Sequence, residues 1–231
     1  MKKINKNVSL LFGYGYNCNS YLVSTPEGDS LLIDSGLGSY DSAWGFSNNN
    51  PVEELKSCLE SFNVKQIILT HGHLDHIGGV ASLRSNELSK IDVVCHKMEQ
   101  THLELPNTSY IDPLMQSTIQ PLTITNPVSH GDTIQLGNFT FNIIHTPGHT
   151  EGSMCLLEED QKWLFSGDCV FPEGAFGRVD FPGSDAQKML DSLESLCSLE
   201  VDSLFAGHMN PILTNASKSI SNSYLNAKLM I

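Results

Sequence analysis

The segment LTHGHLDHIGG, from Leu69 to Gly79, holds three histidines and an aspartate within six residues. It follows the apolar residues 66–69, a pattern that predicts a buried strand. His71 and His73 are spaced i, i+2, so in an extended chain both imidazoles point to the same side. Two imidazoles on one side can share one cation, and the segment therefore predicts a metal site.

Asp75 and His76 follow at the point where the chain turns towards a helix. Gly78 and Gly79 are expected to open that helix, so we expect Asp75 and His76 to point towards a second cation nearby. The alternative is a polar loop with a helix-capping aspartate and exposed histidines. Histidine is scarce, with nine in the whole chain, so the clustering favours the metal site.

Three further residues of ligand type follow predicted strands later in the chain. His149 stands in TPGHT, Asp168 in SGD and His208 in AGH. Each directly follows a glycine, where another part of the chain or a ligand can approach the backbone closely. If these strands end at one rim, their side chains would meet those of the first segment.

The elements that must position these residues can be outlined from periodicity and turn signals. Predicted strands cover residues 8–12, 18–23, 30–34, 66–69, 91–95, 133–136, 139–144, 153–157, 162–166 and 203–206, and predicted helices cover about 51–62, 78–88, 97–102, 185–196 and 216–229. Strands open each half and helices follow, which predicts an α/β fold with two sheets packed together and helices outside, in a single domain over residues 1–231. Residues 104–128 carry four of the ten prolines and predict a lid or binding loop.

Composition limits the partners. The formal net charge of −13 repels nucleic acid and anionic lipid, which leaves a small-molecule substrate as the expected partner. No apolar run reaches the roughly 18 residues of a membrane span, and only three consecutive apolar residues precede Gly13, which argues against an export signal. The six cysteines form no C-x-x-C pair and are expected to be reduced thiols, so we expect a cytoplasmic protein.

The ordered motifs H-x-H-x-D-H, T-P-G-H-T, S-G-D and G-H, preceded by LLIDSG, resemble those of the metallo-β-lactamase-fold hydrolases over about residues 8–210. The resemblance implies a four-layer αβ/βα sandwich of two mixed sheets, with the site at one edge between them. It also implies two metal ions and their ligands. One ion would be held by His71, His73 and His149, and the second by Asp75, His76 and His208. Asp168 would bridge both ions, and Asp34 would support the ligands from behind.

The implied cofactor is two divalent metal ions per chain, with zinc preferred and iron or manganese as alternatives. Two adjacent cations stabilise a bridging hydroxide at neutral pH, which can attack the carbonyl carbon of a small ester, lactone or thioester. Asp75 is the expected catalytic residue, because its carboxylate can orient the hydroxide and pass a proton to the leaving group.

Substrate class is less constrained than the reaction. The segment 174–190 resembles small glyoxalase II-like proteins and persulfide dioxygenases; within it, Arg178 and Asp180 are expected to form an ion pair, with a substrate-carboxylate contact as the alternative. Only 23 residues follow His208, which argues against glutathione, whose hydrolases carry a longer basic C-terminus. A mononuclear iron dioxygenase and a β-lactamase-type amide hydrolase remain alternatives.

Acyl-homoserine lactonases resemble the chain in ligand set and size. Phe171 stands where the well-known type has a tyrosine, so a hydroxyl would have to come from Tyr14, Tyr16 or Tyr110. The turn that carries Tyr14 and Tyr16 is either a flap over the site or a simple hairpin turn. Trp44 and Phe46 are expected to be buried beneath a glycine-rich loop. An exposed apolar loop face would support a homodimer.

The hypothesis of a catalytic metal site makes a direct prediction. His71→Ala and Asp168→Ala should each abolish turnover and lower the metal content of the purified protein, because each removes a ligand. Elemental analysis and an activity assay check both effects. Full activity in metal-depleted protein would contradict the hypothesis.

Overall fold

The computed structural model describes residues 1–40, 51–84 and 91–231. Its strands form a seven-stranded sheet in the order β1 to β7 and a five-stranded sheet in the order β12-β11-β10-β9-β8. The first sheet comprises β1 (Lys2–Lys3), β2 (Val8–Leu11), β3 (Ser20–Ser24), β4 (Asp29–Ile33), β5 (Asn63–Ile68), β6 (Asp92–His96) and β7 (Asn126–Val128). The second comprises β8 (Thr133–Leu136), β9 (Phe139–His145), β10 (Met154–Glu158), β11 (Trp163–Gly167) and β12 (Ser203–Ala206).

Both sheets are mixed. In the first, β1 to β4 pair antiparallel, whereas β4, β5, β6 and β7 pair parallel. In the second, β11 and β12 are parallel and the remaining pairs are antiparallel. Strands β4 and β6 are buried along nearly their whole length because both of their faces are covered, whereas β5 becomes continuously buried and apolar only at its end, Ile67 and Ile68.

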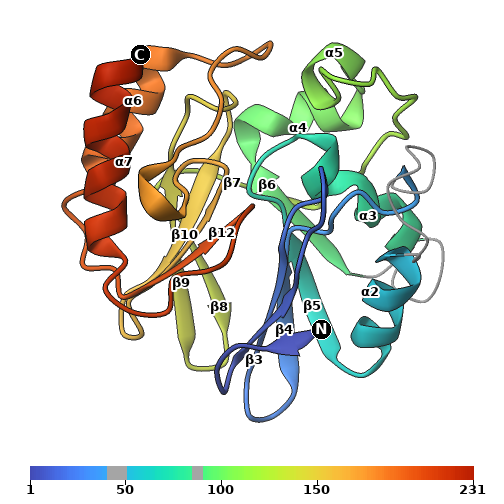
Figure 1. Ribbon diagram of the computed structural model, residues 1–231. Coiled ribbons are helices and arrows are strands. Elements are labelled where there is room, and N and C mark those ends of the chain that lie inside the picture. Colours follow the sequence, from blue (N-terminus) through green and yellow to red (C-terminus); the bar gives the residue numbers. More distant parts are fainter. Residues whose placement is uncertain (41–50, 85–90) are drawn as a thin grey trace.

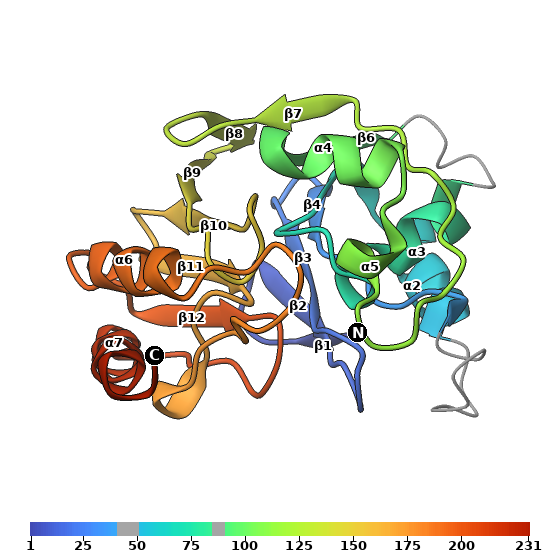
Figure 2. The same cartoon turned by 90° about the horizontal axis from the view of Figure 1, so that it is seen from above.

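Helices cover the outer faces of the two sheets, as Figures 1 and 2 show. They are α2 (Pro51–Glu60), α3 (Leu74–Arg84), α4 (Lys97–Glu104) and α5 (Thr108–Ile111) on the first sheet, and α6 (Ala186–Leu196) and α7 (Ser217–Met230) on the second, with a short 3-10 turn η2 (Pro172–Gly174). Three apolar clusters fill the spaces between the four layers. The predicted four-layer αβ/βα sandwich is therefore confirmed.

The central cluster lies between the sheets and is rich in aromatic rings. Phe165 of β11 stacks on Phe205 of β12 with ring centroids 4.7 Å apart, and Tyr21 of β3 meets both rings edge-on at 5.7 and 5.4 Å. Strand β9 shows why the sequence builds this core: Phe139, Phe141 and Ile143 alternate with half-buried residues and all join the central cluster.

The predicted start of one helix is wrong. The helix expected from about Gly78 begins at Leu74, since the amides of His76 and Ile77 already donate to the carbonyl of His73. Its predicted end at Leu88 lies outside the described residues. The glycines have another role, because a Cβ on Gly78 would lie 2.3 Å from the Leu37 carbonyl oxygen, so the helix packs directly against that backbone.

The segment 104–128 contains more regular structure than its prolines suggested. It holds α5 and the edge strand β7, where Pro127 pairs opposite Cys95 of β6. Proline is tolerated there because an edge strand has a free side.

Residues Trp44 and Phe46 lie outside the described residues. Among the described residues, no helix combines the length and apolarity that a membrane crossing requires.

The aromatic cluster between the sheets yields a stability prediction. Phe205→Ala should lower the free energy of unfolding by about 3–5 kcal/mol, because it leaves a cavity beside three other rings. Urea unfolding of metal-free protein measures the change. Leu229→Ala on α7 is the control, since this side chain is 87% exposed and its truncation should change stability by less than about 0.5 kcal/mol.

Candidate metal centre

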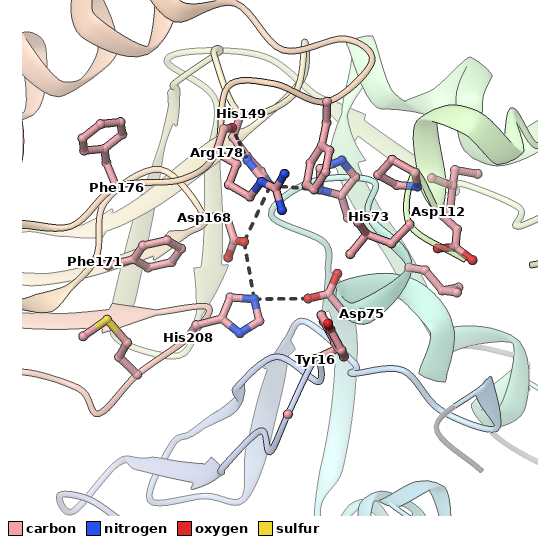
Figure 3. Close-up of a pocket in the computed structure, with 17 residues that line it drawn as sticks. Tyr16, His73, Asp75, Asp112, His149, Asp168, Phe171, Phe176, Arg178 and His208 are labelled. Carbon is pink, nitrogen blue, oxygen red and sulfur yellow. Dashed lines mark hydrogen bonds and ion pairs between the residues drawn. The ribbon is translucent and has the colours of Figure 1, made fainter. Parts of the chain in front are cut away.

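The structure brings all seven predicted ligand residues together at one rim, where strands of both sheets end. His71 and His73 lie in the loop after β5, and Asp75 and His76 in the first turn of α3. His149 lies between β9 and β10, Asp168 follows β11, and His208 follows β12. Figure 3 shows Asp168 between His149 on one side and His208 on the other.

Three histidines form the first group, here called the three-histidine cluster: His71, His73 and His149. His73 Nδ1 lies 3.2 Å from His71 Nε2 and 2.9 Å from His149 Nε2. All three rings are buried. Three imidazole nitrogens that point at one another are the arrangement expected around a shared cation.

The second group, here called the mixed cluster, consists of Asp75, His76 and His208. His208 Nε2 lies 3.1 Å from Asp75 Oδ2, and His76 Nε2 lies 3.5 Å from the same oxygen. This cluster opens further towards solvent than the three-histidine cluster, with the His208 side chain 29% exposed.

Asp168 lies between the two clusters. Its Oδ2 is 3.6 Å from His149 Nε2 and 3.4 Å from His208 Nε2, and its Oδ1 is 3.2 Å from His76 Nε2. One carboxylate therefore reaches a member of each cluster, which is the geometry that a bridging ligand needs.

Buried atoms without partners test whether a metal would fit. Among the described residues, His76 Nε2 and Asp168 Oδ1 are buried and make no hydrogen bond, and they face each other at 3.2 Å. Leaving buried polar atoms unmatched costs free energy, and a divalent cation between them would remove that cost. The donor set of imidazoles and carboxylates suits zinc, iron or manganese. The residues present therefore fit a metal centre.

Hydrogen bonds fix the orientation of the ligand rings. His149 Nδ1 donates to the Arg178 carbonyl oxygen at 2.8 Å, and His76 Nδ1 donates to Asp34 Oδ2 at 2.8 Å. In each ring the Nε2 lone pair is then the one that faces the cluster, as in metal-binding histidines generally.

Asp34 connects the ends of two neighbouring strands to the site. It follows β4 with a left-handed backbone (φ 56°), and its carboxylate accepts hydrogen bonds from the amide and hydroxyl of Thr70 and from His76. Thr70 immediately precedes His71. Asp34 therefore positions one member of each cluster.

Asn19 holds the His208 loop and was not found from the sequence. Its side-chain amide donates to the carbonyls of Ala206 and Met209 at 3.1 and 2.8 Å, and its backbone amide donates to Gly207 at 2.7 Å. No motif marks this residue, because its partners are some 190 positions away in the chain.

Electrostatics differ between the two clusters. Burial lowers the pKa of His73 to about 3 and the pKa of His71 well below its usual value, so both imidazoles stay neutral. Burial also disfavours protonation of His208, but Asp168 and Asp75 outweigh it and raise the pKa of His208 to about 10. Neutral nitrogens thus define one cluster and carboxylate charge the other.

Cys18 lies close to Asp34 and His76 and forms a further group of ligand-type side chains with them. Burial raises the pKa of Cys18 to about 12, so its sulfur is a protonated thiol at neutral pH. His76 Nδ1 already donates to Asp34. We therefore do not count Cys18 as a ligand.

A pocket of about 310 Å³ opens above the two clusters. Its lining is mainly apolar and combines both halves of the chain: Ile111, Leu114, Phe171, Phe176, Phe181 and Met209. Tyr16 also lines it, whereas Tyr110 does not. The Tyr110 hydroxyl donates to Glu99 at 2.9 Å, so it supplies no hydroxyl to the pocket.

Arg178 is the arginine among the pocket-lining residues. Its guanidinium binds Asp180 through two hydrogen bonds of 2.9 and 2.7 Å, which confirms the expected ion pair, and lies 4.2 Å above the Phe181 ring centre. A contact with a substrate carboxylate stays a prediction.

Comparison with known proteins identifies the family. A model of the metallo-beta-lactamase superfamily matches residues 13–208. The chain belongs to this superfamily. Hydroxyacylglutathione hydrolase GloC of Haemophilus influenzae is 29% identical over 234 residues, covering 96% of this chain and 99% of that protein.

Solved structures of the metallo-beta-lactamase superfamily agree with the fold. BLEG-1, a B3 metallo-beta-lactamase, has a TM-score of 0.75 and 27% identity, covering 88% of this chain and 92% of that one. TTHA1623 in a di-iron-bound form has a TM-score of 0.69 and 28% identity, covering 89% and 94%. The chain thus has the metallo-beta-lactamase fold.

Asp34 yields a prediction for this site. Asp34→Asn places an amide N–H₂ against the N–H and O–H donors of Thr70 and His76, and should lower the free energy of unfolding by about 1–3 kcal/mol. It should also weaken metal binding about 10- to 100-fold.

Chemical denaturation and metal titration measure these two effects. Asp29→Asn is the matched control at the other end of β4, where the carboxylate is exposed and pairs with Lys65. Equal behaviour of the two variants would contradict the role of Asp34.

Proposed function

We propose that this protein is a dinuclear metal-dependent hydrolase of small thioesters and esters, and that zinc is its preferred metal. The observation that carries the proposal is the position of Asp168 between two ligand clusters at the base of an apolar pocket. When bound, two divalent cations there would polarise a substrate carbonyl and lower the pKa of an attacking water.

The residues of the chain then divide the remaining work. His71, His73 and His149 would hold one ion, and Asp75, His76 and His208 the other, with Asp168 contacting both. Asp75 lines the pocket and is the carboxylate that we assign to orienting the water and returning its proton to the leaving group. His208, 3.1 Å away, holds Asp75 in place.

The pocket supports an apolar acyl group next to the reacting carbonyl. Phe171, Phe176 and Phe181 provide aromatic walls, and Leu114 lies in the segment 104–128 that we propose as a binding loop. Apolar walls with few polar groups bind by excluding water and leave orientation to the ions and Arg178.

The relative GloC bears on the leaving group. The short C-terminus argued against glutathione thioesters, yet the alignment with this hydroxyacylglutathione hydrolase spans nearly the full length of both proteins. Chain length therefore does not exclude a glutathione thioester. The pocket offers Arg178 as a cation for its carboxylates, although Asp180 already neutralises part of that charge.

A substrate panel tests the proposal. Protein reconstituted with zinc, iron or manganese is assayed on a hydroxyacyl-glutathione thioester, an aryl ester, an acyl-homoserine lactone and a chromogenic β-lactam. We expect thioester cleavage to be at least about 10-fold faster than β-lactam cleavage, and Asp75→Asn to lower kcat by about 10²- to 10⁴-fold. Glu53→Gln, on the exposed face of α2, is the control.

Other outcomes would identify other members of the superfamily. One iron per chain with oxygen uptake on a persulfide would establish the mononuclear dioxygenase instead, and dominant β-lactam cleavage would establish the amide hydrolase. Bound metal without cleavage of any ester or thioester would overturn the proposed substrate class.

A further inference from the structure

A buried carboxylate lies behind the three-histidine cluster and has no role in the chemistry above. Glu99, in the first turn of α4, is completely buried. Its Oε1 accepts hydrogen bonds from the Thr150 hydroxyl at 2.5 Å, the Tyr110 hydroxyl at 2.9 Å and the Gly152 amide at 3.0 Å. Its Oε2 has no hydrogen-bond partner among the described residues.

The partners of Glu99 flank the metal-ligand residues. Thr150 and Gly152 follow His149 in the loop between β9 and β10. The hydroxyl of Thr150 also lies 2.8 Å from the hydroxyl of Ser153, which closes the loop on itself. One carboxylate oxygen therefore holds the C-terminal side of the loop that carries His149.

Glu99 also touches the other ligand loop. Gly72 stands between His71 and His73, and a Cβ at this position would lie 2.3 Å from Glu99 Oε2. A Cβ on Gly152 would lie 2.7 Å from Glu99 Cγ. The backbones of both ligand loops thus pack directly against the same side chain.

The helix that carries Glu99 is fixed at its own start. His96, which caps α4, stacks on His145 with ring centroids 4.0 Å apart and planes at 10°. His145 is the last residue of β9, four positions before His149. The α4 segment therefore contacts the His149 loop on both sides of the ligand, which makes Glu99 a rigid support.

A buried carboxylate without a cationic partner costs stability relative to an apolar side chain. Among the described residues, no lysine or arginine forms an ion pair with Glu99. Burial raises the pKa of Glu99, and the hydrogen bonds from Thr150, Tyr110 and Gly152 only partly oppose this. Leucine or methionine would fill the same space in the core without this cost. The contacts of Glu99 with the two ligand loops therefore need another explanation.

We propose that Glu99 is a positioning residue that fixes the His149 loop against the His71–His73 loop and so sets the metal affinity of the three-histidine cluster. The inference rests on the proposed metal binding but not on any substrate. Groups behind the ligands of a metal site hold them in the binding geometry, and their loss commonly weakens binding about 10- to 100-fold.

The experiment isolates one cluster. In a His208→Ala background, which disables the mixed cluster, zinc affinity is measured by competition with a chelator, with and without Glu99→Ala. We expect Glu99→Ala to weaken binding about 10- to 100-fold. Glu99→Gln keeps an acceptor for Thr150 and Gly152 and should restore most of the affinity. Thr150→Val, which removes one donor, should give an intermediate loss.

A control on the same helix separates positioning from general stability. Glu104 accepts hydrogen bonds from the Gln100 side chain at 3.1 Å and from the Ile124 amide at 3.4 Å, and among the described residues no hydrogen bond joins it to either ligand loop. Glu104→Ala should change the melting temperature of the metal-free protein without changing zinc affinity. Cobalt absorption spectra add a second readout, since a displaced histidine alters the ligand field in Glu99→Ala but not in Glu104→Ala.

The outcomes separate the two proposals. Absence of metal binding in the otherwise unchanged protein would overturn the proposed function. Metal binding that is equal with and without Glu99→Ala would overturn the positioning role alone. If Glu99→Ala does not fold, Thr150→Val and Glu99→Gln provide the test. Unchanged zinc affinity in Thr150→Val would contradict a role through these hydrogen bonds. A loss of affinity in Glu99→Gln as large as that in a ligand variant would contradict it as well.

Discussion

The contact between the two sheets sets the distances on which the site depends. Tyr21 of β3 packs its ring against Phe165 and Phe205 of the opposite sheet, and its hydroxyl donates to the Ala206 carbonyl at 2.8 Å. That carbonyl lies two residues before His208. Because interiors are close-packed and transmit displacement, a shift between the sheets would move the ligands of one half relative to those of the other.

The site concentrates negative charge and nitrogen lone pairs, an arrangement that a bound cation would stabilise. The three-histidine cluster presents neutral nitrogens, whereas Asp75 and Asp168 bring negative charge to a chain that already carries a formal charge of −13. Repulsion between neighbouring carboxylates is relieved by bound positive charge, by protonated histidine or by protonation of one carboxylate. The apolar pocket above the clusters strengthens these interactions because it keeps water away.

The sequence predicted the architecture, and it predicted that the seven candidate ligand residues would lie together, since both leave local patterns in the chain. Alternating apolar residues predicted strands such as β9, and the spacing of His71, His73, Asp75 and His76 predicted a metal-binding loop. The start of α3 was predicted too late, because a glycine pair usually interrupts a helix. Here it lets the helix pack against the backbone at Leu37, a contact that no local pattern reveals.

The supporting residues could not be predicted for a related reason. Glu99 reads as an exposed acidic residue near the start of a helix, yet its partner Thr150 stands 51 positions away. Asn19 and Asp112 are equally inconspicuous; Asp112 lies at the pocket and accepts hydrogen bonds from the amides of Met115 and Ser117. Such residues are defined by tertiary neighbours, so only the folded chain shows what they hold.

The division of ligands between the two sheets has a consequence for the life of the molecule. His71, His73, Asp75 and His76 follow a strand of the first sheet, whereas His149, Asp168 and His208 follow strands of the second. More than half of the chain's length separates His76 from His208, so neither cluster is complete while the second sheet is unmade. A chain emerging from the ribosome acquires its last ligand only when β12 takes its place. Metal binding by both clusters would therefore require that both halves have been synthesised and have docked.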